Sequence, residues 1–407
     1  MITLPSLQER VRTQHDEDVT RIGDEERSRL PIESFWRDAV RLYHTGLHPA
    51  IGLCIRHRGH VVLDRTIGHV ENAPGARAGA IATPDTPFNL FSASKIVTGV
   101  VLMSLVEDGH IALSDKVERY LPEFANNGKE RTTIRHLLNH TAGIPNVPAA
   151  LNPLEGLRTG KVDLTPLYNL RPVTQPGRDV AYHPITSWLL LQEIVTRVTG
   201  KSLRELSNAR LLEPLGFHRM RYGVDESEVH LVAKHARTGP AVPSIMEKIF
   251  SRTIGVDVQT AVNLTNETTF LTAILPSANV IGTGRETTRF LQMMLNGGTI
   301  DGTRVLDTSI ARQIFTDLTP RQLDSTFGMP LRYGLGVMMG DEHFSLYGPG
   351  THSAFGHLGF SGVVVFADPE RDLVVSFQNT GKPMMAPGML RWLWALQRTT
   401  LRVPKLR

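Results

Sequence analysis

The segment that most constrains the fold is the apolar run that begins at Ser92. Residues 92–107 read SASKIVTGVVLMSLVE and are followed by Asp108 and Gly109, a pair that stops helices. The apolar side chains fall on every side of the expected helix and not along a single stripe. A helix without a polar face has to be surrounded by other elements, so we predict a large core around this segment.

The composition fits a large core of this kind. The chain has 407 residues, of which 41% are hydrophobic and 21% charged, so it is long enough for one large domain or two interleaved ones. This balance excludes a disordered chain, a collagen and a coiled coil. Lys and Arg number 44 and Asp and Glu number 40, and the resulting net charge of +4 is too small to indicate a nucleic-acid-binding protein.

The single cysteine and the first residues bear on the expected compartment. Cys54 lies in the apolar run of residues 51–55, where we expect a buried and unreactive thiol. The first twenty residues contain four acidic residues and no apolar stretch typical of a signal peptide, and no later segment is long enough to span a membrane. We therefore expect a cytoplasmic protein without a membrane span.

Periodicity and turn residues predict a mixture of helices and strands. An amphipathic helix precedes two short β-rich runs, the middle of the chain is mainly helical, and a second pair of β-rich runs lies near the end. In chain order, the expected elements are a helix over residues 32–43, strands over 50–56 and 60–65, helices over 92–107, 134–138 and 185–198, strands over 363–367 and 373–377, and a helix over 390–396.

The start of the buried helix carries two residues suited to nucleophilic catalysis. Ser92 and Lys95 are three positions apart, so on a helix their side chains share a face and can meet. A serine becomes a good nucleophile when a base takes its proton, and a lysine serves as that base when burial lowers its pKa. The helix N-terminus also favours the negative oxygen that develops in acyl transfer. By itself S-x-x-K also occurs by chance at solvated helix ends, so the context decides.

That context resembles the serine β-lactamases and penicillin-binding proteins, in which S-x-x-K opens a helix. Residues 137–145, LLNHTAGIP, look like the LLxHTSGxP segment of that superfamily, and residues 333–336, YGLG, look like its entry into a strand. Residues 356–359, GHLG, followed by FADP at residues 366–369, resemble its GHxG strand and hairpin. The order and spacing agree from about residue 48 to 380, which is most of the chain.

The resemblance implies an α+β protein with a β-lactamase/transpeptidase-like fold. Residues 31–85 and 331–407 would form a domain with an antiparallel sheet flanked by the terminal helices, after a polar leader at residues 1–30. Residues 86–330 would form an inserted, mainly helical domain, in which residues 204–275 are treated as a lid or insertion. The site is expected between the two parts.

The resemblance also implies roles for three side chains. Ser92 would be the acylated nucleophile, and Lys95 its base or proton relay. Tyr182 matches the tyrosine of the superfamily's Y-x-N element and would carry a proton to the leaving group or take one from water. Beside an ammonium its phenol should be easier to deprotonate than usual. Without this context, a buried tyrosine with a hydrogen-bonded hydroxyl would be the simpler interpretation of Tyr182.

A second group of residues matches the K-T-G strand of the superfamily, with histidine in place of lysine. His357 and Gly359 would contact the substrate, and Phe360 would follow the glycine. The backbone N–H groups of Ser92 and Phe360 would then hold the oxygen of a tetrahedral intermediate. Outside this context a lone histidine between glycines is more often structural.

Three features favour a carboxylesterase similar to family VIII over a β-lactamase. Pro184 occupies the third position of Y-x-N and offers no side-chain amide to a lactam. His357 replaces a fixed cation that would bind a substrate carboxylate, so small neutral esters are the expected substrates. Residues 276–279, 288–290 and 354–370 resemble the esterase branch in detail.

Several alternatives remain beside this hypothesis. The same acyl-enzyme would serve an acyltransferase, and a β-lactamase or a penicillin-binding protein with little turnover is a further possibility. The sequence contains no G-x-S-x-G, so the nucleophile elbow of α/β-hydrolases is absent. Residues 15–18 and the pair His44 and His48 lack the H-E-x-x-H spacing of zinc proteases, and we expect neither a metal nor a cofactor.

Overall fold

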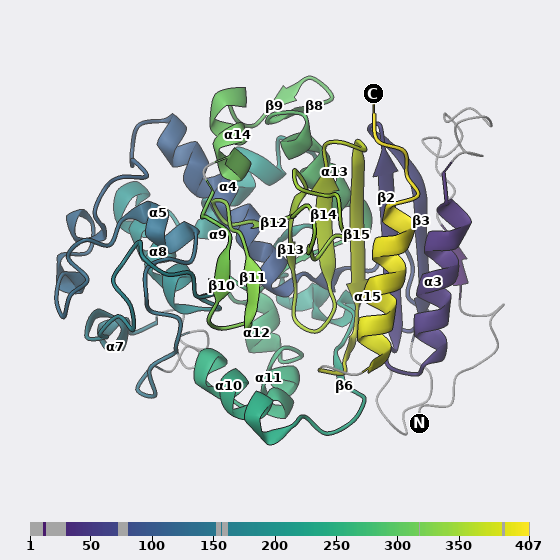
Figure 1. Ribbon diagram of the computed structural model, residues 1–407, viewed down its shortest axis with the longest axis horizontal. Coiled ribbons are helices and arrows are strands. Elements are labelled where there is room, and N and C mark those ends of the chain that lie inside the picture. Colours follow the sequence, from purple (N-terminus) through teal and green to yellow (C-terminus); the bar gives the residue numbers. More distant parts are fainter. Residues whose placement is uncertain are drawn as a thin grey trace.

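The computed structural model describes residues 11–13, 30–71, 80–151, 156, 162–316, 318–384 and 387–406. A sheet carrying two helices lies at one end of the longest axis, and a mainly helical part lies at the other end (Figure 1). This arrangement confirms the predicted α+β fold with a sheet flanked by terminal helices. Most of the expected leader, residues 1–30, lies outside the described residues, but residues 11–13 form an edge strand of the sheet.

In the described part of the chain the main sheet has seven strands, and each runs antiparallel to its neighbours. A strand from near the start of the chain pairs with a strand from near its end at the centre of the sheet. The long segment between these two strands is therefore an insertion within one sheet. In spatial order the strands are β1 (Val11–Thr13), β3 (His60–Gly68), β2 (Ala50–His57), β15 (Leu373–Asn379), β14 (Val364–Asp368), β13 (Phe355–Leu358) and β12 (Met338–Met339).

Alternation along β15 explains how this sheet is buried on both faces. Leu373, Val375 and Phe377 belong to the core beneath the terminal helices, whereas Val374 points to the core of the helical part.

The hairpin between β2 and β3 is formed by a local turn. At this turn Arg58 and Gly59 both adopt positive φ, at 50° and 78°. A two-residue turn of this kind matches the twist of antiparallel strands.

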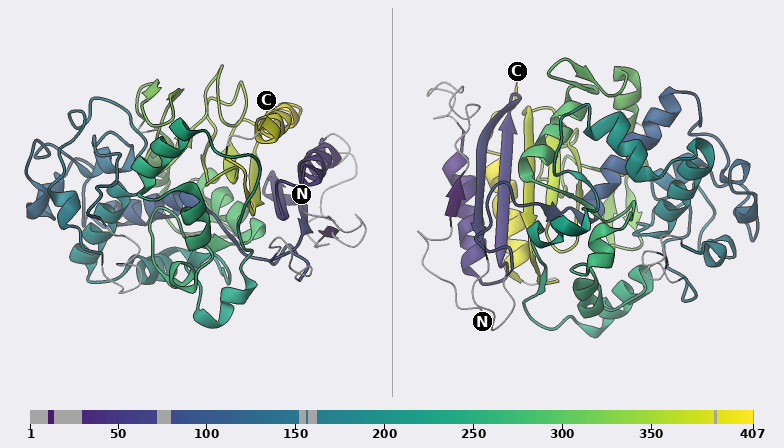
Figure 2. Two further views of the ribbon diagram at one scale, coloured as in Figure 1. Left: turned by 90° about the horizontal axis from the view of Figure 1, so that it is seen from below. Right: turned by 180° about the vertical axis from the view of Figure 1, so that it is seen from behind.

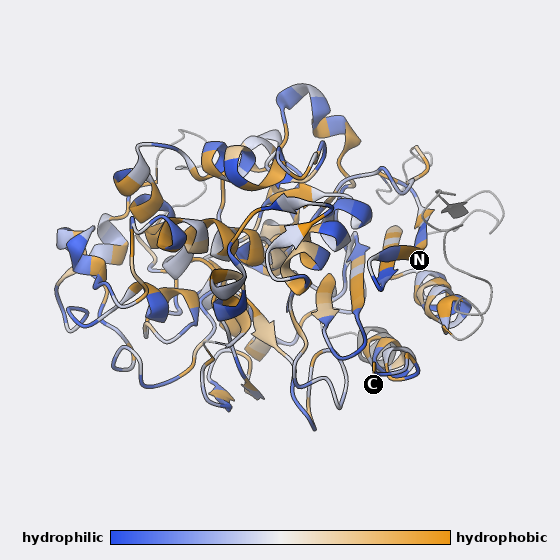
Figure 3. Cartoon of the chain, turned by 90° about the horizontal axis from the view of Figure 1, so that it is seen from above, coloured by the Kyte–Doolittle hydropathy of each residue, from blue (hydrophilic) through white to orange (hydrophobic). Residues whose placement is uncertain are grey.

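Helices cover the two faces of the sheet. Helices α3 (Ile32–His44) and α15 (Pro387–Thr400) pack on one face, and α13 (Gly284–Leu295) packs on the other (Figures 1 and 2). Each of the two terminal helices has a hydrophilic and a hydrophobic side, as Figure 3 shows, because one stripe faces the sheet.

The single cysteine, Cys54, is fully buried below α13, as expected. Burial raises the pKa of its thiol.

The apolar segment forms the centre of the helical part. Helix α4 (Ser94–Glu107) is buried from Ser94 to Leu105, as its all-round apolar sequence predicts. Around it lie α5 (Ile134–Leu138), α7 (Thr165–Tyr168), α8 (Thr186–Thr199), α9 (Leu203–Ser207), a π-helix (Asn208–Leu212), α10 (Ser244–Ile254), α11 (Val258–Leu264), α12 (Thr268–Thr272) and α14 (Thr308–Thr316), with short 3₁₀ helices at Phe91–Ala93, Val117–Arg119, Pro122–Phe124 and Glu226–Leu231. No helix within the described ranges is both long and apolar enough to cross a bilayer.

Small sheets that the sequence did not reveal lie outside the main sheet, and one of them, formed by residues 236–237 and 381–382, joins the two parts. Strand β4 (Phe88–Asn89) pairs with β7 (Val280–Gly282) and β7 with β5 (Arg221–Tyr222), so the chain just before Ser92 is tied to a segment far away in the sequence. The remaining pairs are β6 (Ala236–Arg237) with β16 (Gly381–Lys382), β8 (Thr299–Ile300) with β9 (Thr303–Arg304) and β10 (Gln322–Asp324) with β11 (Met329–Leu331).

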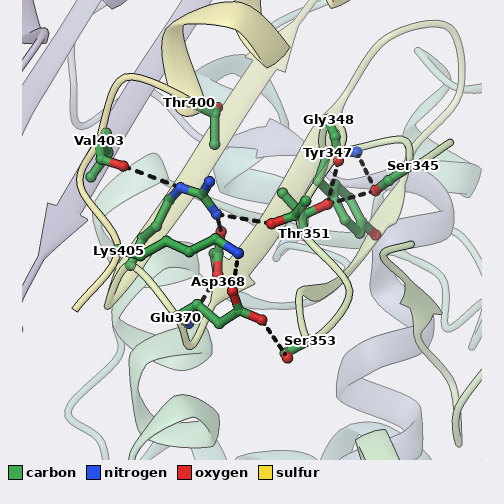
Figure 4. Close-up of polar contacts among 12 residues, drawn as sticks. Ser345, Tyr347, Gly348, Thr351, Ser353, Asp368, Glu370, Thr400, Val403 and Lys405 are labelled. Carbon is green, nitrogen blue, oxygen red and sulfur yellow. Dashed lines mark hydrogen bonds and ion pairs between the residues drawn. The ribbon is translucent and has the colours of Figure 1, made fainter. Parts of the chain in front are cut away.

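The chain after α15 is fastened to the hairpin between β14 and β15 (Figure 4). The buried guanidinium of Arg371 donates to the carbonyl of Val403 over 3.2 Å and to the carboxylate of Asp368 over 2.7 Å. Lys405 and Glu370 form an ion pair beside it. These contacts hold the end of the chain against the sheet, on the side away from Ser92.

Candidate active site

Ser92 and Lys95 lie at the junction between the helical part and the sheet. Ser92 is in the 3₁₀ turn that precedes α4, and Lys95 is in the first turn of α4 itself. The Lys95 Nζ lies 3.1 Å from the Ser92 Oγ, so the two polar atoms meet as the spacing predicts. Ser92 is half-buried and can be reached by a substrate, whereas Lys95 is completely buried.

The other neighbours of Lys95 determine which group can hold a proton. Its Nζ lies 3.0 Å from the carbonyl oxygen of Pro184 and 3.1 Å from that of Ser277, and both oxygens can only accept. Burial holds the pKa of Lys95 well below its usual value. A neutral amine has two N–H groups, one for each carbonyl, and its lone pair then faces the hydroxyl of Ser92. Lys95 is therefore placed to accept the proton of Ser92.

Tyr182 reaches the same pair from the segment before α8. The Lys95 Nζ lies 5.1 Å from the centre of the Tyr182 ring. The buried phenol is close enough to Ser92 for that hydroxyl to lower its pKa, although no hydrogen bond joins them, and burial outweighs this influence and raises the pKa overall. The expectation of an easily deprotonated phenol was therefore wrong, because burial penalises the phenolate. Tyr182 holds its proton and is a candidate acid.

His140, from the LLNHTAGIP segment, supports the backbone around Tyr182. Its carbonyl accepts a hydrogen bond from the N–H of Ala181 over 3.0 Å, and its Nδ1 accepts one from the N–H of His183 over 2.9 Å. The two rings of His140 and Tyr182 are 4.7 Å apart. His140 adopts a φ of 63°, a conformation that costs a non-glycine residue about 1–3 kcal/mol and that its surroundings must hold in place.

Asp324 supports Tyr182 from the opposite side, a role that nothing in the sequence indicated. Its Oδ2 accepts a hydrogen bond from the Tyr333 hydroxyl over 2.8 Å, and its Oδ1 accepts from the N–H groups of Thr326 and Phe327. Thr326 in turn donates to the carbonyl of Tyr182 over 3.1 Å, and the Phe327 ring lies 4.9 Å from the Tyr182 ring. A D-S-T-F sequence indicates only a turn, so the residue that this turn supports could not be identified.

Two glycines of the family-like motifs are required by close backbone contact. A Cβ on Gly336 would lie 2.9 Å from the carbonyl oxygen of Lys95, so the YGLG turn can rest on α4 only with glycine there. A Cβ on Gly359 would lie 2.5 Å from the carbonyl oxygen of Leu90. The end of β13 therefore approaches the chain two residues before Ser92, as an oxyanion site built from both would require.

His357 is fully buried on β13 and is electrically neutral. Its Nδ1 lies 2.6 Å from the carbonyl of Leu358, which can only accept, so Nδ1 carries the hydrogen and Nε2 is left as an acceptor. Burial and the nearby Lys95 lower the pKa of His357 to about 3. The ring centre is 5.9 Å from that of Tyr182. Within the described residues Nε2 has no hydrogen-bond partner, so this position offers an acceptor and no positive charge.

Phe360 follows this strand and lies beside the residue that precedes Ser92. The rings of Phe91 and Phe360 meet edge to face with centres 5.5 Å apart. Among the described residues, neither Ser92 nor Phe360 uses its backbone N–H in a hydrogen bond. Phe250 of α10 stacks on Phe360 at 5.5 Å, which brings part of the expected lid, residues 204–275, next to the site.

The structure describes only some of the residues that the sequence offered as possible metal ligands. Residues 15–18 lie outside the described residues. In the described ranges, no group of three or more His, Cys, Asp or Glu side chains is arranged to hold a metal ion. The residues gathered at Ser92 are instead those of acid–base and acyl-transfer chemistry.

Two known proteins with similar sequences are named as an esterase/beta-lactamase and as a carboxypeptidase. LipL of Mycobacterium tuberculosis, named an esterase/beta-lactamase, is 29% identical over 331 residues, which are 76% of this chain and 73% of LipL. A protein of Salmonella agona named "Putative D-alanyl-D-alanine carboxypeptidase" is 25% identical over 349 residues, 81% of this chain and 78% of that protein.

Solved structures confirm the expected fold. A family VIII carboxylesterase superposes with a TM-score of 0.76 at 24% identity and covers 96% of this chain and 99% of its own. EstA from Arthrobacter nitroguajacolicus superposes with a TM-score of 0.71 at 25% identity and covers 91% and 98%. Residues 38–398 match the family described as Beta-lactamase. With this match over most of its length and this fold, the chain belongs to the β-lactamase family.

Proposed function

We propose that this serine hydrolase of the β-lactamase family is a carboxylesterase that cleaves small, neutral esters through an acyl-Ser92 intermediate. The observation that carries the proposal is the contact between the buried Lys95 Nζ and the Ser92 Oγ, which lie 3.1 Å apart. The naming of LipL as an esterase/beta-lactamase supports the choice of an ester.

Acylation begins when the Ser92 Oγ attacks the ester carbonyl carbon and its proton passes to the Lys95 Nζ. The carbonyl oxygen becomes negative and accepts hydrogen bonds from the N–H groups of Ser92 and Phe360. When the tetrahedral intermediate collapses, the bond to the alcohol oxygen breaks and the Tyr182 phenol gives that oxygen its proton. The Lys95 ammonium then returns a proton to Tyr182, so both residues end the step as they began.

Deacylation repeats these steps with water as the nucleophile. A water molecule attacks the acyl carbon, its proton passes through Tyr182 and Lys95, and the Ser92 oxygen leaves as a hydroxyl. The carboxylic acid departs and the enzyme is regenerated. An alcohol or amine in place of water would give acyl transfer by the same route.

Two residues favour a neutral ester over a substrate with a carboxylate. His357 carries no charge and presents an acceptor nitrogen, so it does not attract a carboxylate. Pro184 has no side-chain amide, and its carbonyl is already bound to Lys95. A β-lactam or a D-alanyl-D-alanine peptide would therefore meet an acceptor nitrogen at His357 and not a cation there.

The test compares three substrates with the wild type and with Ser92→Ala. We expect multiple turnovers with p-nitrophenyl butyrate, at least about 10³-fold less in the variant, and little turnover of a cephalosporin or of a D-alanyl-D-alanine peptide. Circular dichroism checks that the variant is folded. Faster release of D-alanine than of nitrophenol would overturn the ester assignment in favour of a carboxypeptidase, and full activity in folded Ser92→Ala would overturn the mechanism.

A further inference from the structure

A second buried lysine, Lys382, contacts the site without taking part in the steps above. It ends the short strand β16 and its side chain is fully buried. Its Nζ donates to the carbonyl of Phe360 over 3.0 Å, to the carbonyl of Asn379 over 3.1 Å and to the Asn379 Oδ1 over 3.2 Å. All three oxygens can only accept, so an ammonium would have a donor for each, whereas burial holds the pKa of Lys382 well below its usual value.

The same Nζ also lies against the residue that precedes the nucleophile. Nζ is 4.5 Å from the centre of the Phe91 ring and 5.9 Å from that of Phe360, distances at which a cation is attracted to a ring face. Phe91 adopts a φ of 50°, a conformation that only its surroundings can maintain. Lys382 therefore touches both residues whose placement sets the two N–H groups of the oxyanion site.

The backbone next to Lys382 lies very close to a neighbouring segment, which permits this contact. A Cβ on Gly381 would lie 1.7 Å from the carbonyl oxygen of Leu47, so only glycine allows β16 to approach so closely. Two histidines near Lys382 are also buried, and burial, with a smaller influence of Lys382, lowers the pKa of His48 to about 3 and that of His235 well below its usual value. His235 also packs on the Phe91 ring at 4.7 Å.

We propose that Lys382 is a positioning residue that fixes the two backbone donors of the oxyanion site, because its Nζ contacts both the Phe360 carbonyl and the Phe91 ring. The inference rests on the proposed function, because it assigns a role within the same acylation step. Donors that stabilise a developing negative charge act only when they are held in place before the reaction. Loss of Lys382 should therefore affect the transition state more than the binding of the ester.

Lys129 offers a matched control in the helical part. It is also buried, and its Nζ donates to a carbonyl and a side-chain oxygen of one asparagine, Asn126, and to the carbonyl of Leu170. It lies 5.0 Å from the centre of the Phe124 ring. The two lysines thus have the same types of partner, and only Lys382 is bound to residues of the active site.

The experiment compares Lys382→Met with Lys129→Met after thermal unfolding has shown that both are folded. For p-nitrophenyl butyrate, Lys382→Met should lower kcat by about 10- to 100-fold with little change in KM. Butylboronic acid, which forms a tetrahedral anion on an activated serine, should bind more weakly by a similar factor. Lys129→Met should keep the kcat and the boronic acid affinity of the wild type.

Other results would overturn the proposal. An unchanged kcat in Lys382→Met, a rise in KM alone, or an equal loss in Lys129→Met would make Lys382 a structural residue only. If Lys382→Met does not fold, Lys382→Gln, whose amide keeps two N–H donors, takes its place, and failure of both to fold would also show a purely structural role. Absence of ester turnover in the wild type would instead contradict the proposed function, and boronic acid binding would still test Lys382.

Discussion

Lys95 and Lys129 have similar surroundings in the helical part of the molecule. They differ in one of the three oxygen atoms that contact Nζ. Each lysine is buried with three oxygen atoms around its Nζ. Around Lys129 all three oxygens can only accept, so an ammonium satisfies the pocket, and burial lowers its pKa only to about 8. Around Lys95 the third oxygen is the hydroxyl of Ser92, which can donate to a neutral amine. Burial makes a lysine weakly basic, but the third partner decides whether it can act as a base.

Replacement of each lysine by methionine is the strongest way to break this comparison. Lys95→Met should lower kcat/KM for p-nitrophenyl butyrate by about 10³-fold or more, because Ser92 loses its base. Lys129→Met should leave kcat/KM unchanged and lower the free energy of unfolding by about 1–3 kcal/mol, because its oxygen partners stay buried. Steady-state kinetics and urea unfolding measure both. Equal losses of activity in the two variants would contradict a special role for Lys95.

The same difference predicts how activity depends on pH. Lys95 works as a base only when neutral, so kcat/KM should rise with pH through its lowered pKa and then level off. The pKa of His357, about 3, lies too low to produce this rise. Because the unfolded chain binds a proton at Lys95 up to a higher pH than the folded chain does, this group should also make the protein more stable as pH rises. A kcat/KM or a stability that falls as pH rises through this range would be inconsistent with these expectations.

Tyr182 tests the other half of the proton path. Tyr182→Phe removes the hydroxyl and keeps the ring that packs against Phe327, so kcat should fall by about 10²-fold with little loss of stability. Tyr347→Phe is the control, since Tyr347 is also buried and its hydroxyl donates to the Met338 carbonyl. An ester with a better leaving group should reduce the effect of Tyr182→Phe, and an equal effect for all esters would argue against an acid role.

A substitution at Gly359 tests whether close backbone contact at the site matters more than ordinary packing elsewhere. The added Cβ of Gly359→Ala would meet the Leu90 carbonyl at 2.5 Å, and the end of β13 would have to move. We expect kcat to fall by about tenfold and the protein to lose about 1–3 kcal/mol of stability. Gly52→Ala is the control, because its Cβ would meet Phe88 at an ordinary 3.4 Å. A crystal structure of Gly359→Ala with an unmoved strand and full activity would refute this.

The smallest expected effect concerns Phe250 on α10. Its ring stacks on Phe360, so Phe250→Ala should raise KM for bulky aromatic esters by about two- to tenfold and leave small esters almost unaffected. Ile245→Ala on the same helix should change neither, because that side chain is 65% exposed. KM values across an ester series measure the difference, and parallel changes for small and bulky esters would exclude a role of Phe250 in selectivity.

The part of the site that the sequence predicted is the part made by local spacing. Ser92 and Lys95 share one turn, and the all-round apolar run after them indicates a buried helix without any tertiary information. Asp324 and Lys382 could not be found in this way, because each acts on a residue far away in the chain and neither interrupts a pattern. The strands β4, β7 and β5 were missed for the same reason, since segments of two or three residues carry no periodicity.

The expectation for Tyr182 failed because burial outweighs the influence of its polar neighbours and raises its pKa. The sequence indicated a lysine nearby and hence an easier deprotonation, but it did not show that the phenol and the amine are both buried and that burial lowers the pKa of the amine. The sign of such a pKa shift depends on depth in the fold, which local sequence does not record.

The rate at which an alkyl fluorophosphonate labels the protein at different pH values tests the central claim most directly. The reagent bonds phosphorus to an activated serine oxygen and releases fluoride, and the stable adduct is located by peptide mass mapping. We predict one adduct, on Ser92, formed at a rate that rises with pH in the wild type and is slow and independent of pH in Lys95→Met. An adduct on another residue, or an unchanged pH profile in the folded variant, would contradict a Ser92 nucleophile activated by Lys95.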